Sequence, residues 1–73
     1  MFDFSKLRGR IVEKFGTCAA FAVAVGLPES AISNRLNNRV PIDSEEIVSW
    51  SRPEMLDIPA EELHIYFFTP KVR

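Results

Sequence analysis

The chain has 73 residues and a formal net charge of −1, which leaves room for one domain near the lower size limit of an unstapled hydrophobic core. Hydrophobic residues make up 47% and charged residues 26% of the chain, a composition that excludes a disordered or fibrous protein. One cysteine and one histidine exclude an internal disulfide and a zinc site with three or four protein ligands. We therefore expect a single domain over residues 1–73, without metal or cofactor, in a reducing cytoplasm.

The N-terminal region does not resemble a signal peptide, because basic residues interrupt every apolar run before Phe15. The longest apolar stretch, residues 18–25, is far shorter than the roughly 20 residues that cross a bilayer. Charge is divided unevenly along the chain: residues 1–41 carry six basic and three acidic side chains, and residues 42–73 carry three basic and seven acidic ones. The more basic part, residues 1–41, could therefore face phosphates. No membrane partner is expected.

Apolar residues at helical spacing predict three helices in the first half of the chain, over about residues 5–15, 18–24 and 29–37. Gly16 and Gly26 are placed to end the first two helices, because glycine adopts left-handed conformations at little cost. Thr17 is placed to cap the second helix through its hydroxyl. Pro28 fits the start of the third helix, whose Ile32 is expected to face the core.

The second half of the chain is predicted to form a helix over about 44–51, a short helical turn near 53–57, a last helix over about 60–66 and an extended tail over about 68–73. Asp43 and Glu46 have the spacing of a capping box, and Ser51 and Glu54 have the same spacing. Pro59 fits the start of the last helix. Together these elements predict a compact all-α domain of five helices.

Residues 17–37 have the sequence form of a helix-turn-helix: a short capped helix, a glycine turn, and a second helix with polar residues on its exposed N-terminal turns. Ala22 is small where the two helices would cross, and Ile32 supplies the apolar contact of the second helix. Helical hairpins with a glycine turn also occur in bundles that bind no DNA, so this pattern alone leaves both interpretations open.

Three parts of the chain resemble a family of small phage helix-turn-helix proteins. They are residues 2–17, residues 21–27 together with 33–38, and residues 58–63 together with 66–72. These are the Cro-type and modulator-of-repression regulators of the lysogeny switch in phages of Gram-positive bacteria, within the lambda-repressor-like class. The resemblance implies a five-helix domain in the cytoplasm of a bacterial host. It also implies either a third helix that enters the major groove or a relative that inactivates the phage repressor by binding it.

Under this resemblance, the base-reading positions fall on Glu29, Ser30, Ser33, Asn34 and Asn37. The phosphate contacts fall on Thr17, Arg35, Asn38 and Arg39. Asparagine can pair with adenine, serine with several bases, and glutamate can accept from cytosine, whereas phosphate contacts set the register of the protein on DNA. The other interpretation of these residues is an ordinary solvated helix face, with Thr17 acting only as a helix cap.

Two departures from the family pattern favour a protein partner. Cys18 occupies the position after the capping threonine, where the family usually has glutamine, and Glu29 places a carboxylate near the phosphates. The surface expected to bind a repressor in that case comprises Cys18, Ala19, Ala20, Val23 and Glu29. The sequence thus predicts a phage regulator that reads operator DNA through its third helix, with an antirepressor that binds the phage repressor as the alternative.

Other functions have less support in the sequence. There is no glycine-rich phosphate loop, no metal-ligand spacing and no nucleophile with a plausible base, so we do not expect an enzyme. A helix-turn-helix antitoxin stays open, although such proteins usually carry a toxin-wrapping extension. The ending Tyr66-Phe67-Phe68 is expected to close the core, or to contact a partner, because two adjacent phenylalanines cannot both point inward from an extended segment. The partners considered are operator DNA, a phage repressor and a second copy of this chain.

Overall fold

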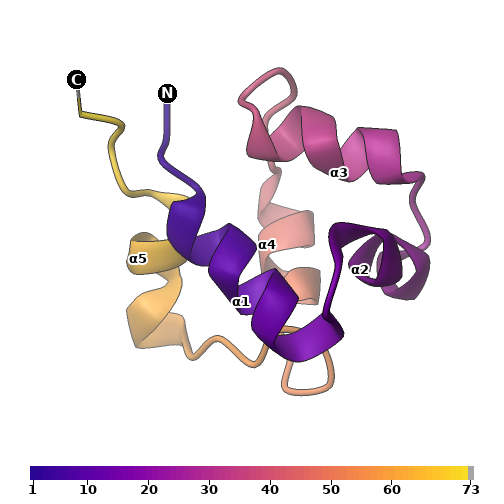
Figure 1. Ribbon diagram of the computed structural model, residues 1–73. Coiled ribbons are helices and arrows are strands. Elements are labelled where there is room, and N and C mark those ends of the chain that lie inside the picture. Colours follow the sequence, from indigo (N-terminus) through magenta and orange to yellow (C-terminus); the bar gives the residue numbers. More distant parts are fainter. Residues whose placement is uncertain (73) are drawn as a thin grey trace.

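A computed structural model describes residues 1–72, and this part of the chain is all-helical (Figure 1). Its helices are α1 (Ser5–Phe15), α2 (Cys18–Val25), α3 (Glu29–Leu36), α4 (Ser44–Trp50) and α5 (Leu63–Phe67), with a 3-10 turn over Ala60–Glu62 before α5. The predicted fold class, an all-α domain of five helices, is confirmed. The last predicted helix differs in detail, because its first turn is 3-10 and its α-helical part ends at Phe67.

The ends of the helices follow from the residues placed there. Thr17 caps α2, with its Oγ1 atom accepting a hydrogen bond from the Ala20 N–H at 3.1 Å. Gly26 ends α2 in the left-handed region, at φ 86°, and its N–H donates to the last carbonyls of the helix. Asp43 and Glu46 form the predicted capping box at the start of α4, with bonds of 2.8 and 3.2 Å. Local signals therefore fix α2 and the start of α4.

The predicted helical turn near 53–57 is wrong, because the chain forms non-helical turns after α4. The Leu56 N–H donates to the Trp50 carbonyl and the Ile58 N–H to the Ser51 carbonyl, at 2.9 and 3.0 Å. The Ser51 hydroxyl has no hydrogen-bond partner among the described residues, so the predicted capping box with Glu54 does not form. The physical reason is burial of Leu56 and Ile58, which brings the chain back against the core instead of letting it continue as a helix.

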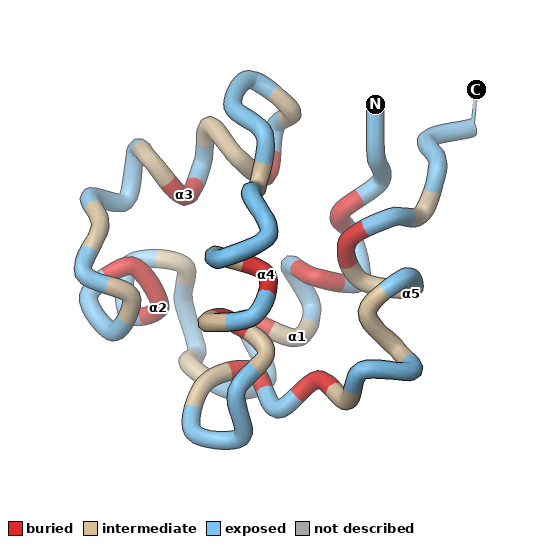
Figure 2. Tube along the Cα trace, turned by 180° about the vertical axis from the view of Figure 1, so that it is seen from behind, coloured by how far each residue is buried: buried red, intermediate tan, exposed pale blue. Residues whose placement is uncertain are grey.

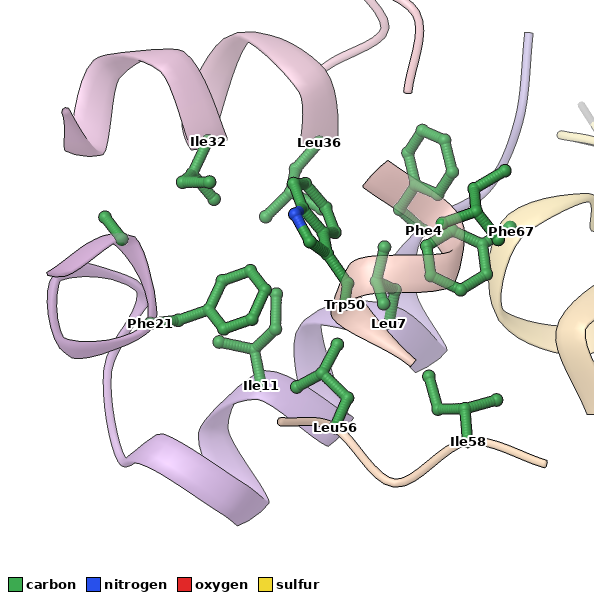
Figure 3. Close-up of a cluster of buried hydrophobic side chains, with 12 residues drawn as sticks. Phe4, Leu7, Ile11, Phe21, Ile32, Leu36, Trp50, Leu56, Ile58 and Phe67 are labelled. Carbon is green, nitrogen blue, oxygen red and sulfur yellow. The ribbon is translucent and has the colours of Figure 1, made fainter. Parts of the chain in front are cut away.

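The core is built around Trp50, which is fully buried in the middle of the molecule (Figure 3). Its ring packs edge-on against Phe21 of α2, with ring centroids 5.1 Å apart. Ile32 and Leu36 point from α3 into the same cluster (Figure 3). These contacts fix which side of α3 faces inward, and they leave its opposite side exposed to solvent (Figure 2).

The two ends of the chain lie side by side (Figure 1). The Asp3 N–H donates to the Thr69 carbonyl at 2.8 Å, and the Lys71 N–H donates to the Met1 carbonyl at 3.2 Å. An isolated antiparallel bridge joins Phe2 to Pro70. The extended tail expected over 68–73 is therefore present through the described residues, paired with the N-terminal segment, and position 73 lies outside the described part.

Candidate functional site

A short turn joins α2 to α3, and both helices pack against the core. The Leu27 N–H donates to the Ala22 carbonyl at 3.0 Å, so the turn folds back onto the end of α2. The Pro28 carbonyl accepts from the Ala31 N–H at 3.0 Å and starts α3. Ala22 and Ile32, the two residues predicted to hold the unit together, are both buried. The outer side of α3 thus belongs to a helix whose inner side is buried in the core.

The predicted base-reading residues form the outer side of α3, which we call the reading face: Glu29, Ser30, Ser33, Asn34 and Asn37. At its N-terminal end, Glu29 and Ser30 are exposed, and their side chains make no hydrogen bond to another residue of the described chain. Asn34 is half-buried. The side chains at this end are therefore available to a partner.

The C-terminal end of the reading face is bonded to the rest of the protein. The Asn37 Oδ1 atom accepts from the Arg8 guanidinium at 2.9 Å, and its Nδ2 atom donates to the Ser33 hydroxyl at 3.2 Å. Arg8 also donates to the Leu36 carbonyl at 3.3 Å. Arg8 of α1 thus caps the C-terminus of α3, where backbone carbonyls lack helical partners. Asn37 would have to give up these bonds to read a base.

Arg35, a predicted phosphate contact, lies in an ion pair between α3 and α4. Its Nε atom is 2.9 Å from Glu46 Oε2, and its Nη1 atom donates to the Ala31 carbonyl at 2.9 Å. Each of the two side chains is only 17% exposed. The guanidinium is therefore directed toward α4 and its own helix.

Asn38, a second predicted phosphate contact, binds the N-terminal segment. Its Oδ1 atom accepts from the Phe2 N–H at 3.0 Å, and its Nδ2 atom donates to the Phe2 carbonyl at 2.9 Å. The residue has a positive φ of 62°, a conformation that asparagine tolerates better than most side chains. Thr17 caps α2 as described above. Only Arg39 among the four predicted phosphate ligands is exposed with no side-chain bond to another described residue.

The surface predicted to bind a protein lies on α2. Ala19, Ala20 and Val23 are exposed, and Val23 is 81% exposed; we call these three residues the α2 patch. Cys18 is half-buried and packs against the core, so it contributes less to this surface than predicted. Glu29 follows on the first turn of α3. Since α2 contains no charged residue, the patch is an apolar surface with one nearby carboxylate.

Comparison with known proteins assigns the chain to a family. A family model described as a protein of unknown function (DUF739) matches residues 1–70. The chain belongs to this family. It is also similar to a solved structure, the solution structure of the modulator of repression (MOR) of the temperate bacteriophage TP901-1 from Lactococcus lactis. The two are 38% identical, with a TM-score of 0.80 over 99% of this chain and 95% of the other. No curated protein sequence matches.

This similarity supports the modulator-of-repression part of the resemblance seen in the sequence. The structure to which the chain is similar is named as a modulator of repression and not as a Cro-type protein. The chain is thus a small helical protein similar to a phage modulator of repression, and the choice between DNA and a repressor as its partner rests on its own surfaces.

Sequence reasoning missed an apolar groove of about 440 Å³ beside the two chain ends, which we call the terminal groove. Its walls come from the N-terminal segment, the loop after α3, Ile47 of α4 and the end of α5; the apolar lining residues include Met1, Phe2, Phe4, Val40, Pro41, Ile42 and Phe68. Phe67 is buried, whereas Phe68 is 48% exposed and packs edge-on against Phe2 with ring centroids 5.7 Å apart. The adjacent Phe67 and Phe68 were the feature of the sequence that indicated this groove, because Phe67 closes the core and Phe68 lines the surface.

The Asp3 carboxylate binds a backbone group at the start of α1. The pKa of the Asp3 carboxyl is lowered, chiefly because its carboxylate accepts the Ser5 N–H at 2.9 Å. Residues 1–72 contain no group of three histidine, cysteine, aspartate or glutamate side chains arranged to hold a metal ion. Within the same residues, no helix combines the length and the apolar character needed to cross a bilayer.

Proposed function

We propose that this protein is an antirepressor, a phage regulator that binds the phage repressor and thereby prevents or alters its binding to operator DNA. The observation that carries the proposal is the 38% identity to the modulator of repression of phage TP901-1 over 99% of this chain. This function replaces operator reading, the first interpretation of the sequence, with its alternative. It keeps the fold of a helix-turn-helix domain and assigns its exposed face to a protein partner.

The distribution of arginine contacts supports a protein partner over DNA. Contacts between basic side chains and phosphates supply most of the sequence-independent affinity for DNA. Here the guanidiniums of Arg8, Arg10 and Arg35 are all used inside the molecule: Arg8 caps α3, Arg10 donates to the carbonyls of Leu56 and Asp57, and Arg35 pairs with Glu46. Arg8 and Arg35, the two of these arginines that contact α3, are therefore already engaged at the C-terminal end of this helix, which weakens its electrostatic attraction for a duplex.

The α2 patch and Glu29 provide a complementary surface for a repressor. Faces that bind DNA are basic because they contact phosphates, so the Glu29 carboxylate favours encounter with such a face. Exposed Val23 and its alanine neighbours offer apolar area that gains free energy when a partner covers it. A repressor docked in this way could not insert the same face into the major groove, which accounts for antirepression by direct competition.

The test is calorimetric titration of the full-length cognate repressor with this protein and with two matched valine variants. Val23→Glu adds a charge to the α2 patch, whereas Val48→Glu adds the same charge to another exposed valine, on α4. We expect Val23→Glu to weaken repressor binding at least about tenfold, the scale of a disrupted interface centre, and Val48→Glu to leave it unchanged. Absence of binding by the unmodified protein would disprove the function, and equal binding by all three would disprove the docking surface.

A further inference from the structure

The ion pair between Arg35 and Glu46 joins the last turn of α3 to the first turn of α4. Glu46 uses both carboxylate oxygens: Oε2 lies 2.9 Å from Arg35 Nε, and Oε1 accepts the Asp43 N–H at 3.2 Å in the capping box. Arg35 is held a second time, by its own bond to the Ala31 carbonyl. The pair is therefore oriented at both ends by backbone groups, and both side chains are mostly withdrawn from solvent.

Such an arrangement determines what the guanidinium can bind. An arginine with an accessible guanidinium binds phosphate through two parallel hydrogen bonds. Arg35 in its observed position already donates to a carboxylate and a carbonyl, and its charge is balanced by Glu46. A phosphate that approached this site would meet the Glu46 carboxylate, and taking Arg35 away would leave that carboxylate partly buried without its partner, which is costly.

We propose that Glu46 is a positioning residue that discriminates against duplex DNA, because it holds Arg35 in an internal ion pair and so withholds this cation from the phosphodiester backbone. Without the Glu46 charge, Arg35 and the exposed Arg39, four residues further along, present two guanidiniums at the C-terminal end of α3. The preference of the domain for a protein over DNA thus depends partly on the loss of the Arg35 contact to phosphate, and not only on contacts with the protein partner. This inference goes beyond antirepression and does not depend on it.

The test uses Glu46→Gln and a matched control. Glutamine keeps an oxygen that can accept the Asp43 N–H, so the capping box is preserved while the charge that binds Arg35 is lost. Glu45→Gln makes the same change in net charge in the same first turn, at an exposed residue that has no bond to Arg35. Binding to a short labelled DNA duplex of arbitrary sequence is measured by fluorescence anisotropy at several salt concentrations, and thermal unfolding of each variant is followed by circular dichroism.

We expect Glu46→Gln to bind the duplex about tenfold more tightly than Glu45→Gln at low salt, the scale of one hydrogen bond to a charged group. The slope of log K against log salt should steepen by about 0.9, the value for one additional phosphate contact. The double variant Glu46→Gln with Arg35→Gln should return to the affinity of the unmodified protein, whose net charge it shares. Equal affinity and equal slope in the two single variants would overturn the proposal, since a purely structural role for Glu46 would not raise DNA affinity.

A second measurement uses the unmodified protein and does not depend on the folding of Glu46→Gln. The Nε–H signal of Arg35 is followed by nuclear magnetic resonance while the same duplex is added at low salt. We expect this signal to stay in place while that of Arg39 shifts. A shift of Arg35 as large as that of Arg39 would show that the ion pair does not withhold Arg35, whatever the outcome of the repressor titration.

Discussion

The two ends of α3 use similar polar residues in opposite ways. At the N-terminal end, Glu29 and Ser30 are exposed, with side chains that make no bond to another described residue. At the C-terminal end, Arg35 and Asn37 are bonded to side chains on α4 and α1, and Asn38, just beyond the helix, is bonded to the N-terminal segment. A polar helix face is therefore not evidence of a reading surface until the internal bonds of its side chains are known.

This difference bears on the choice between DNA and protein as the partner. The end of α3 that is free carries a carboxylate, and the end that carries an arginine has that charge paired inside the molecule. Phosphates are repelled by the carboxylate at the first end, and at the second end they lose the contact that Arg35 would otherwise offer. Both ends therefore favour the antirepressor proposed above over an operator-binding protein.

The largest expected effect comes from removing a buried side chain by which α3 packs on the core. Ile32 is fully buried against α2 and the core, so Ile32→Ala should lower the free energy of unfolding by about 2–5 kcal/mol through lost burial and a residual cavity. Ile32→Val, which removes one methylene, should cost about 0.5–1.5 kcal/mol. Urea denaturation of both variants checks this, and equal, small losses would mean that α3 is not held by the core.

Asn38 tests how firmly the end of α3 is tied to the N-terminal segment. Asn38→Ala removes both bonds to Phe2 and also places a less tolerant residue at φ 62°, for an expected loss of about 2–3 kcal/mol. Asn38→Gly removes the same bonds without backbone strain, so it should cost about 1 kcal/mol less. In both variants the Phe2 amide should exchange faster with solvent. Unchanged exchange in both would contradict the proposed connection.

Arg8 tests the connection between α1 and the same end of α3. Arg8→Ala removes the bonds to Asn37 and to the Leu36 carbonyl and should destabilise the protein by about 1 kcal/mol, a common net value for an exposed hydrogen bond or a helix cap. Lys14→Ala is the matched control, because it removes the same charge from an exposed residue of α1 that forms no ion pair with another described residue. Thermal unfolding should separate the two variants, and coincident curves would rule out the cap.

The smallest expected effect concerns the N-terminal segment to which Asn38 binds. Hydrogen bonds from Ser5 lower the pKa of Asp3 below its ordinary value of 3.8. Because the pKa is lower in the folded state, this contribution to stability is present above that value and is lost as the pH falls through the folded-state pKa. The melting temperature of Asp3→Asn should therefore fall less than that of the unmodified protein upon acidification below pH 3.8. Parallel acid profiles would show that the Asp3 contact contributes nothing.

The fold was largely predictable from the sequence, since its main signals are local. Gly26 ends α2, and Thr17 and Asp43 cap the helices that follow them, as their positions indicated. The segment after α4 was not predictable in this way. The spacing of Ser51 and Glu54 suggested a helix, but the burial of Leu56 depends on packing between distant parts of the chain and outweighs such a local pattern.

The candidate site was predictable in its location and not in the bonding of its residues. The sequence placed the exposed side of α3 correctly, because helical spacing determines which residues face outward. The internal partners of Arg35, Asn37 and Asn38 lie 11, 29 and 36 residues away in the chain, beyond the reach of any local pattern. The terminal groove was missed for the same reason, since four separate segments of the chain line it.

The most direct test of the central claim is a competition experiment on the operator. Labelled operator DNA carrying the cognate full-length repressor is titrated with this protein, and a parallel titration omits the repressor. Antirepression predicts that the repressor complex is lost or altered as protein is added, and that the protein alone gives no discrete complex with the operator. A discrete, salt-sensitive complex of the protein alone, with the repressor complex unaffected, would contradict the account and restore operator reading as the function.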